Sequence, residues 1–158
     1  MTEIIFYCID SDVNRFLFNF LNQLIFKNGK KVFLYSNSAE KLKNLDKMLW
    51  DLCEESEFLP HSVYNSKNES QKYERLLLSD ELLNFNSANY LLISTFLDNF
   101  GFINGFEKLF YVYSRMSKNS VDQARISFDN YKNLNYKVSL NIRNGGKWES
   151  CGEFVKLD

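Results

Sequence analysis

The sequence predicts an α/β domain with three layers, in which helices flank a mostly parallel central sheet in a Rossmann-like arrangement. Two apolar runs of strand-forming residues, 4–9 and 31–35, are separated by a stretch whose apolar residues recur at helical spacing. Two strands joined by a helix within about thirty residues form a βαβ unit, which makes the strands parallel. We therefore expect these two strands to pair in a parallel sheet.

Helix boundaries follow from capping residues. Asp10-Ser11-Asp12 ends the first apolar run, and we expect Asp10 or Ser11 to cap the first helix. That helix is predicted to stop at Asn28-Gly29, where glycine permits a left-handed residue. Asn37-Ser38-Ala39-Glu40 resembles a capping box and is expected to open the second helix.

The second half of the chain continues the alternation of strands and helices. We expect a helix at 120–134, a loop at 62–72, and a loop or irregular helix at 96–107. Further strands are predicted at 76–78, 90–94, 109–113 and 136–140. We expect one domain over residues 1–148, followed by a polar tail over 149–158.

Composition limits the classes of function. The chain has 158 residues, 45% of them hydrophobic, and a formal net charge of −1, which argues against a protein that neutralises phosphates along nucleic acid. Cys8, Cys53 and Cys151 are an odd set with no C-x-x-C pair, so neither a disulfide framework nor a zinc site is predicted. There is no apolar stretch of membrane-spanning length and no positively charged start typical of a signal peptide. We expect a cytoplasmic protein without cofactor or metal.

Few residues favour catalysis. Asp10-x-Asp12 after the first strand faintly resembles phosphatases of the haloacid-dehalogenase type, which makes a small magnesium-dependent phosphohydrolase the alternative function. The glycine-rich motifs for dinucleotides and triphosphates are missing, so a nucleotide-binding module has only the fold class in its favour. His61 is the only histidine, and we interpret it as a structural or surface residue.

Two surfaces favour binding of a partner. Trp50, Phe58 and Pro60 form either an exposed aromatic patch or a small core beneath a loop, and the residues alone leave both open. Arg125 and Lys132 lie beside the apolar stripe of the late helix, where positive charge would suit the carboxylate of a peptide end. Pairing of Arg125 with Asp122 or Asp129 is the competing interpretation.

Taken together, several motifs resemble one family, the chi subunit of bacterial DNA polymerase III holoenzyme. The resemblance covers residues from about 4 to about 148. Its most specific parts are Leu-Asp-x-x-Leu-Trp and the Phe-x-Pro-His that follows it shortly afterwards. The matching residues are Phe6-Tyr7, Gly29-Lys30-Lys31-Val32, Leu45-Asp46-x-x-Leu49-Trp50, Phe58-Leu59-Pro60-His61, Ala124-Arg125, Tyr131 and Tyr136.

The resemblance implies a single α/β domain without catalytic activity. Chi proteins bridge the clamp-loader complex to single-stranded-DNA-binding protein, whose acidic C-terminal tail ends in an aromatic residue with a free carboxylate. The positions matching the tail site are Val121, Arg125, Phe128 and Asp129. Val121 and Asp129 stand where well-known members carry lysines, and Arg115, Lys118 or Lys132 would supply replacement charge.

A second family surface binds the psi subunit and, in relatives, a helicase. Trp50 and Phe58, next to Pro60, match it. The resemblance thus favours the exposed patch over the small core. It also implies a monomer that acts within a larger complex and meets DNA only indirectly.

Overall fold

The computed structural model describes residues 1–54 and 57–155. Among them, eight strands follow the order β3-β4-β2-β5-β6-β1-β7-β8. The predicted α/β class with a mostly parallel sheet is confirmed, because β1 runs parallel to β6 and β7, and β4 runs parallel to β2 and β3. Among the described pairings of named strands, the β7–β8 pair is the antiparallel one. No described helix is both long and apolar enough to cross a membrane.

The chain divides into two compact units. The first unit contains residues 1–13 and the described residues from 92 onward, and the second unit contains residues 14–91. A boundary of one domain at residue 148 stays a prediction.

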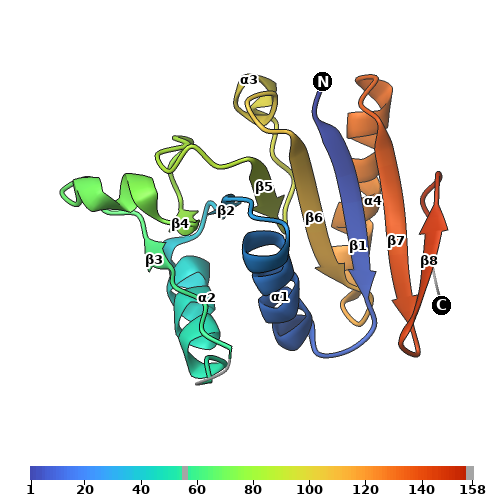
Figure 1. Ribbon diagram of the computed structural model, residues 1–158. Helices are drawn as coiled ribbons and strands as arrows, with labels where there is room; N and C mark the ends of the chain where they lie inside the picture. The colour runs from blue at the N-terminus through green and yellow to red at the C-terminus, as the bar shows by residue number, and fades with distance from the viewer. Residues whose placement is uncertain (55–56, 156–158) are drawn as a thin grey trace. The chain divides into compact units, whose positions relative to one another are not determined.

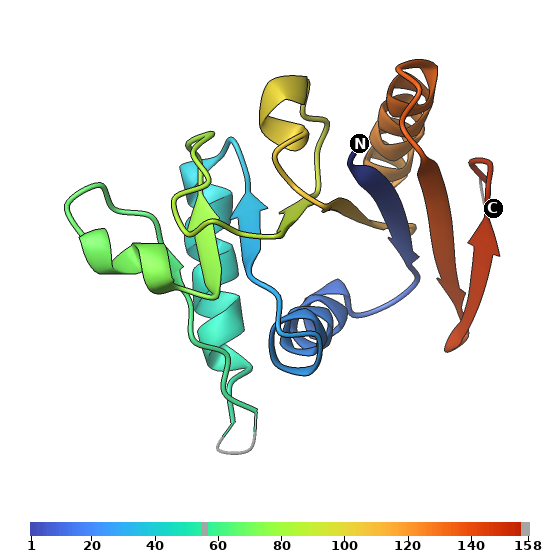
Figure 2. The ribbon, with the colours of Figure 1, turned by 45° about the horizontal axis from the view of Figure 1, so that its top comes forward.

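In the first unit, β6, β1, β7 and β8 lie side by side, and α4 lies along one face of them (Figures 1 and 2). Phe6 of β1 is in register with Tyr111 of β6, and their rings stack with centroids 4.5 Å apart. Phe128 of α4 meets Phe6 edge-on at 5.2 Å. The elements are β1 (Glu3–Ile9), α3 (Phe100–Ile103), β6 (Lys108–Ser114), α4 (Lys118–Asn133), β7 (Val138–Asn144) and β8 (Lys147–Cys151).

In the second unit, α2 packs on β3 and β4 (Figure 2). Ser38 caps α2 by accepting a hydrogen bond from the Lys41 N–H at 3.2 Å, so the cap lies one residue later than Asn37. The elements are α1 (Val13–Asn22), a π-helical turn (Gln23–Lys27), β2 (Val32–Tyr35), α2 (Ala39–Asp51), β3 (Ser62–Val63), a 3₁₀ turn (Glu69–Tyr73) and β4 (Leu76–Ser79); β5 (Tyr90–Ile93) spans the boundary between the units.

Three local predictions need correction. β1 and β2 are not neighbours in the strand order, because β2 stands between β4 and β5. The last predicted strand begins later and runs further, as β7. Residues Glu149 to Cys151, assigned to the polar tail, belong to β8, whose hairpin with β7 turns at Gly145 and Gly146 with φ of 58° and 80°. Residues 156–158 of that tail lie outside the described residues.

The first helix ends as predicted. After α1 the chain makes a single π-helical turn, in which the Asn28 N–H donates to the Gln23 carbonyl at 3.1 Å. Gly29 then adopts a φ of 66°, the left-handed conformation that a side chain disfavours.

Tyr131 ties α4 to the loop that follows β5. Its hydroxyl donates to the Leu97 carbonyl at 2.8 Å and accepts from the Leu97 N–H at 3.2 Å, in a fully buried site. Burial raises the pKa of this phenol, so the hydroxyl keeps its proton.

We expect Tyr131→Phe to lower the free energy of unfolding by about 1–3 kcal/mol, because both polar groups of Leu97 then lose a buried partner. Urea denaturation measures the loss. Tyr73→Phe is the matched control, since that side chain is 71% exposed. Equal losses in the two variants would contradict a structural role for the Tyr131 hydroxyl.

Candidate functional site

The first candidate surface is one side of α4, which we call the α4 face: Val121, Arg125, Phe128 and Lys132. Their spacing of four, three and four residues places them on one stripe of a helix. Ser117 starts that helix by accepting from the Ser120 N–H. Val121 and Phe128 are buried, whereas Arg125 and Lys132 are exposed. The α4 face therefore places two exposed cations beside two buried apolar side chains.

The two cations of the α4 face, Arg125 and Lys132, have different surroundings. Arg125 and Asp129 are both exposed, and among the residues that the structure describes no ion pair is recorded between these two. Lys132 lies over the Phe128 ring, with Nζ 6.0 Å from the ring centre. Arg115 instead donates to Asn144 at 3.2 Å, and Asp129 is exposed.

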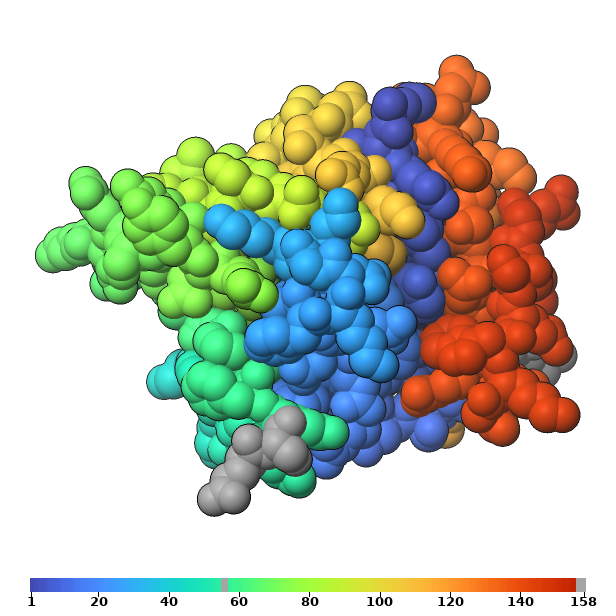
Figure 3. All heavy atoms as spheres, viewed as in Figure 1, coloured from blue at the N-terminus to red at the C-terminus, as the bar shows by residue number. Residues whose placement is uncertain are grey.

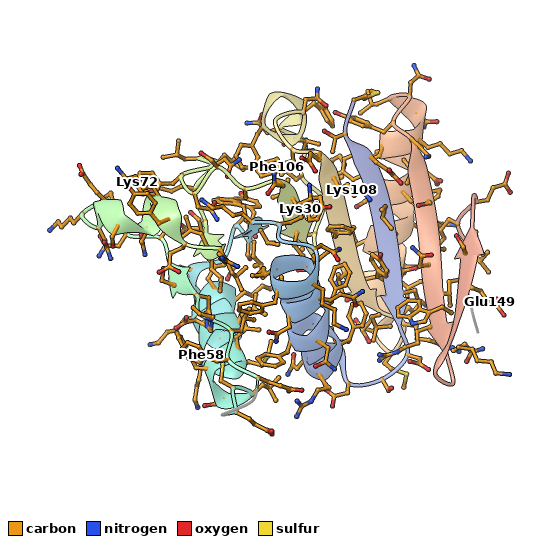
Figure 4. The ribbon with its side chains drawn as sticks, viewed as in Figure 1. Lys30, Phe58, Lys72, Phe106, Lys108 and Glu149 are labelled. Carbon is orange, nitrogen blue, oxygen red and sulfur yellow. The ribbon has the colours of Figure 1, made fainter. Side chains whose placement is uncertain are left out.

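The second surface is the aromatic patch, made of Trp50, Phe58 and Pro60. Trp50 and Phe58 are 41% and 56% exposed, with ring centroids 5.8 Å apart, and Pro60 is exposed. Figure 4 shows Phe58 beside the C-terminal part of α2. The structure thus places these residues at the surface and not in a small core.

His61 supports the patch from below. It is buried, and its ring stacks on Trp50 with centroids 4.2 Å apart. Nδ1 lies 2.7 Å from the Leu59 carbonyl oxygen, and Nε2 lies 3.3 Å from the carboxylate of Asp46. Exposure alternates along the segment: Phe58 and Pro60 point outward while Leu59 and His61 are buried. The structural interpretation of His61 therefore agrees with its position.

A cavity of about 700 Å³ adjoins the aromatic patch within the second unit. Residues 57–60 form one wall, and in Figure 3 the described residues that follow α2 lie against α1. The end of α1 and the turn after it form the other wall. The residues of this second wall were not predicted from the sequence. The available signal was Phe26, which falls off the apolar stripe of its helix and is 50% exposed. The cavity is lined by Asn19, Asn22, Gln23, Phe26, Lys27, Glu57, Phe58 and Pro60.

Asp10 serves the β7–β8 hairpin. Its Oδ2 accepts from the Gly145 N–H at 2.9 Å, and its Oδ1 accepts from Arg143 Nε at 3.1 Å. Arg143 also donates to the Ser11 carbonyl at 2.6 Å. Of the two residues expected to cap the first helix, Asp10 or Ser11, Asp10 instead binds the hairpin with both carboxylate oxygens.

These contacts do not favour phosphohydrolase chemistry at Asp10. Both carboxylate oxygens are engaged, and Asp12 is exposed with a φ of 34°. Within residues 1–54 and 57–155, no three His, Cys, Asp or Glu side chains cluster closely enough to hold a metal ion. The three cysteines are free thiols, of which Cys8 is buried.

A comparison with protein families now decides the class. The family model described as DNA polymerase III chi subunit, HolC, matches residues 1–139. The chain belongs to the DNA polymerase III chi subunit family. The resemblance predicted from its motifs is confirmed, although the matched region ends at residue 139 and not near residue 148. No curated protein matches the chain.

As a member of the chi family, the chain is an accessory subunit of DNA polymerase III. The matched region includes all of α4 and the aromatic patch. It ends inside β7, so most of the β7–β8 hairpin and the segment after it lie beyond the match.

Asp10→Asn is expected to destabilise the chi-family chain at neutral pH and to have a smaller effect in acid. The Gly145 N–H, aided by Arg143, lowers the pKa of the Asp10 carboxyl below its ordinary value of 3.8. A depressed pKa stabilises the fold above 3.8, and this contribution is lost as pH falls through the folded-state value. Urea denaturation of the variant and the parent at pH 7, 5 and 3 measures the difference.

Asp80→Asn, at an exposed carboxylate, is the control for the general effect of removing a charge. A difference between parent and Asp10→Asn that stays constant across the three pH values would contradict the assigned contacts.

Proposed function

We propose that this chi-family chain is a non-catalytic linker of the replication machinery in the cytoplasm. It connects the clamp-loader complex to single-stranded-DNA-binding protein by binding that protein's acidic C-terminal tail at the α4 face. It acts as a monomer within the larger complex, needs no cofactor or membrane, and reaches DNA only through its partners.

The observation that carries this proposal is the exposed guanidinium of Arg125 beside a buried aromatic ring, Phe128. A free carboxylate accepts two parallel hydrogen bonds from arginine, and a terminal phenylalanine needs an apolar contact nearby. Lys132 adds a second cation on the same stripe. Asp129 opposes an acidic tail, so the net charge of the face favours the tail only modestly.

A short tail that orders on binding loses entropy, so one aromatic and one arginine contact yield an affinity of about −8 kcal/mol, roughly micromolar. Single-stranded-DNA-binding proteins are multimeric and coat the strand, which presents many tails at once. Tethering then raises the overall affinity by orders of magnitude above that of one tail.

The aromatic patch supports a second binding role. We assign it to the psi subunit or a helicase, because Trp50 and Phe58 are the kind of large, half-exposed side chains that dominate protein interfaces. His61 fixes the Trp50 ring in place before a partner arrives, which lowers the entropy cost of binding.

Fluorescence anisotropy tests the tail proposal with a labelled acidic peptide that ends in phenylalanine with a free carboxylate. The same peptide without its last residue is the control. We expect saturable binding that weakens with salt and requires the phenylalanine. Absence of binding to the full peptide at high protein concentration would refute the tail site.

Arg125→Ala is expected to weaken binding of the tail peptide by about 1.5–3 kcal/mol, because the carboxylate loses its charged partner. Its free energy of unfolding should change by less than about 0.5 kcal/mol, since the side chain is exposed. Arg125→Lys keeps the charge without the fork and should be intermediate. Arg75→Ala removes an exposed arginine of the second unit and serves as the control. If Arg125→Ala and Arg75→Ala bind the tail peptide with equal affinity, Arg125 is excluded from the site.

Phe58→Ala is expected to weaken binding of purified psi subunit by about 2 kcal/mol, the scale of an interface hot spot. Unfolding should become easier by less than about 1 kcal/mol, because more than half of the ring is exposed. Calorimetric titration and urea denaturation give the two values. Tyr73→Ala, an exposed aromatic of the same unit, is the control, and a loss of several kcal/mol in stability with Phe58→Ala would mark that ring as core.

A further inference from the structure

The segment after β8, residues 152–155, places a phenylalanine against the α4 face. The Phe154 ring meets Phe128 edge-on with centroids 5.7 Å apart, and it stacks on Tyr113 at 6.1 Å with an interplanar angle of 24°. All three residues belong to the first unit. We call the site formed by Tyr113 and Phe128 the aromatic subsite.

A second contact holds the same segment. Lys132 Nζ, which lies over the Phe128 ring, also reaches the Gly152 carbonyl oxygen at 3.5 Å. The cation of the α4 face is thus shared between an aromatic ring and a backbone oxygen of the segment. An incoming carboxylate would compete with that oxygen for Lys132.

The chemistry of the segment matches that of the proposed ligand. Glu153, an exposed carboxylate, directly precedes Phe154, so the chain itself offers an acidic residue next to a phenylalanine. The subsite formed by Tyr113 and Phe128 has contact area for one such ring, because the remaining faces of Phe128 are packed and the ring is 1% exposed. Two phenylalanines cannot occupy the same contact.

The segment is held weakly enough to exchange. The contact from Lys132 to Gly152 is at the long limit for a hydrogen bond and is exposed to solvent. Phe154 itself is only half-buried, and Glu153 and Val155 on either side of it are exposed. These residues also lie beyond the part of the chain that the family model matches.

We propose that Phe154 occupies, in the free protein, the aromatic subsite that the terminal phenylalanine of a partner tail enters, so that the C-terminal segment competes with the tail. This inference rests on the proposed tail-binding function. Binding at the α4 face is then an exchange in which one phenylalanine replaces another. The apparent association constant for the tail is then the intrinsic constant multiplied by the fraction of molecules whose segment has left the subsite.

The test is a titration of the labelled peptide ending in phenylalanine against the full chain and its Phe154→Ala variant. If the segment is docked in roughly 80–90% of molecules, its removal should tighten binding about five- to tenfold. Val155→Ala alters the neighbouring exposed residue and should leave affinity unchanged. Amide hydrogen exchange provides a separate measurement, because the amides of Glu153 to Val155 should exchange faster when unlabelled peptide is added to the parent protein.

The outcomes separate this inference from the tail proposal. Tighter binding by Phe154→Ala than by the parent supports the inference, and so does binding by the variant alone. Equal binding by both overturns the inference and leaves the tail site standing. Weaker binding by the variant also overturns it, since Phe154 would then form part of the site. Failure of both proteins to bind refutes the tail proposal, and the inference with it.

Discussion

The contacts of Phe6 with Tyr111 and Phe128 are the constraint on which the first unit depends. Phe6 sits at the centre of the parallel pairing, stacked on Tyr111 from the adjacent strand and met edge-on by Phe128 from α4. This packing fixes the rotation of α4, because the helix must direct Phe128 toward the sheet. With Phe128 inward, Arg125 and Lys132 flank it at the surface. The chemistry of the α4 face is therefore a by-product of how the core is filled.

In the aromatic patch, the large rings are exposed and their neighbours in sequence are buried. Its two large rings stay exposed because their neighbours in sequence, Leu49 and Leu59, take the buried positions. The buried His61 then supplies a flat, hydrogen-bonded surface under Trp50. Leaving two large rings exposed forgoes the free energy that their burial would release, and the binding role proposed for the patch gives a reason for this cost.

Local patterns in the sequence predicted the fold class, most strands and the late helix. The spacing of apolar residues and the helix caps depend on only a few neighbouring residues, so the sequence shows them directly. The pairing of β1 with β2 was wrong because strand order depends on contacts far apart in the chain, which periodicity does not encode. The role of Asp10 was missed for the same reason: its partners, Arg143 and Gly145, lie more than a hundred residues away. Helical spacing placed Arg125 and Lys132 beside the apolar stripe of α4, and the family resemblance marked Val121 and Phe128 as candidate site residues. The wall containing Phe26 needed the fold to bring it beside Phe58.

The position of β7 has a consequence for how the chain tolerates shortening. The part shared with the family ends at residue 139, inside a strand that continues to Asn144 and pairs with β1 from Val138 to Ile142. Cutting there would strip the backbone groups of Phe6 to Cys8 of their hydrogen-bonding neighbour and turn an interior strand into an open edge. An edge of apolar residues invites pairing with another chain, so the hairpin beyond the shared region protects the first unit from self-association.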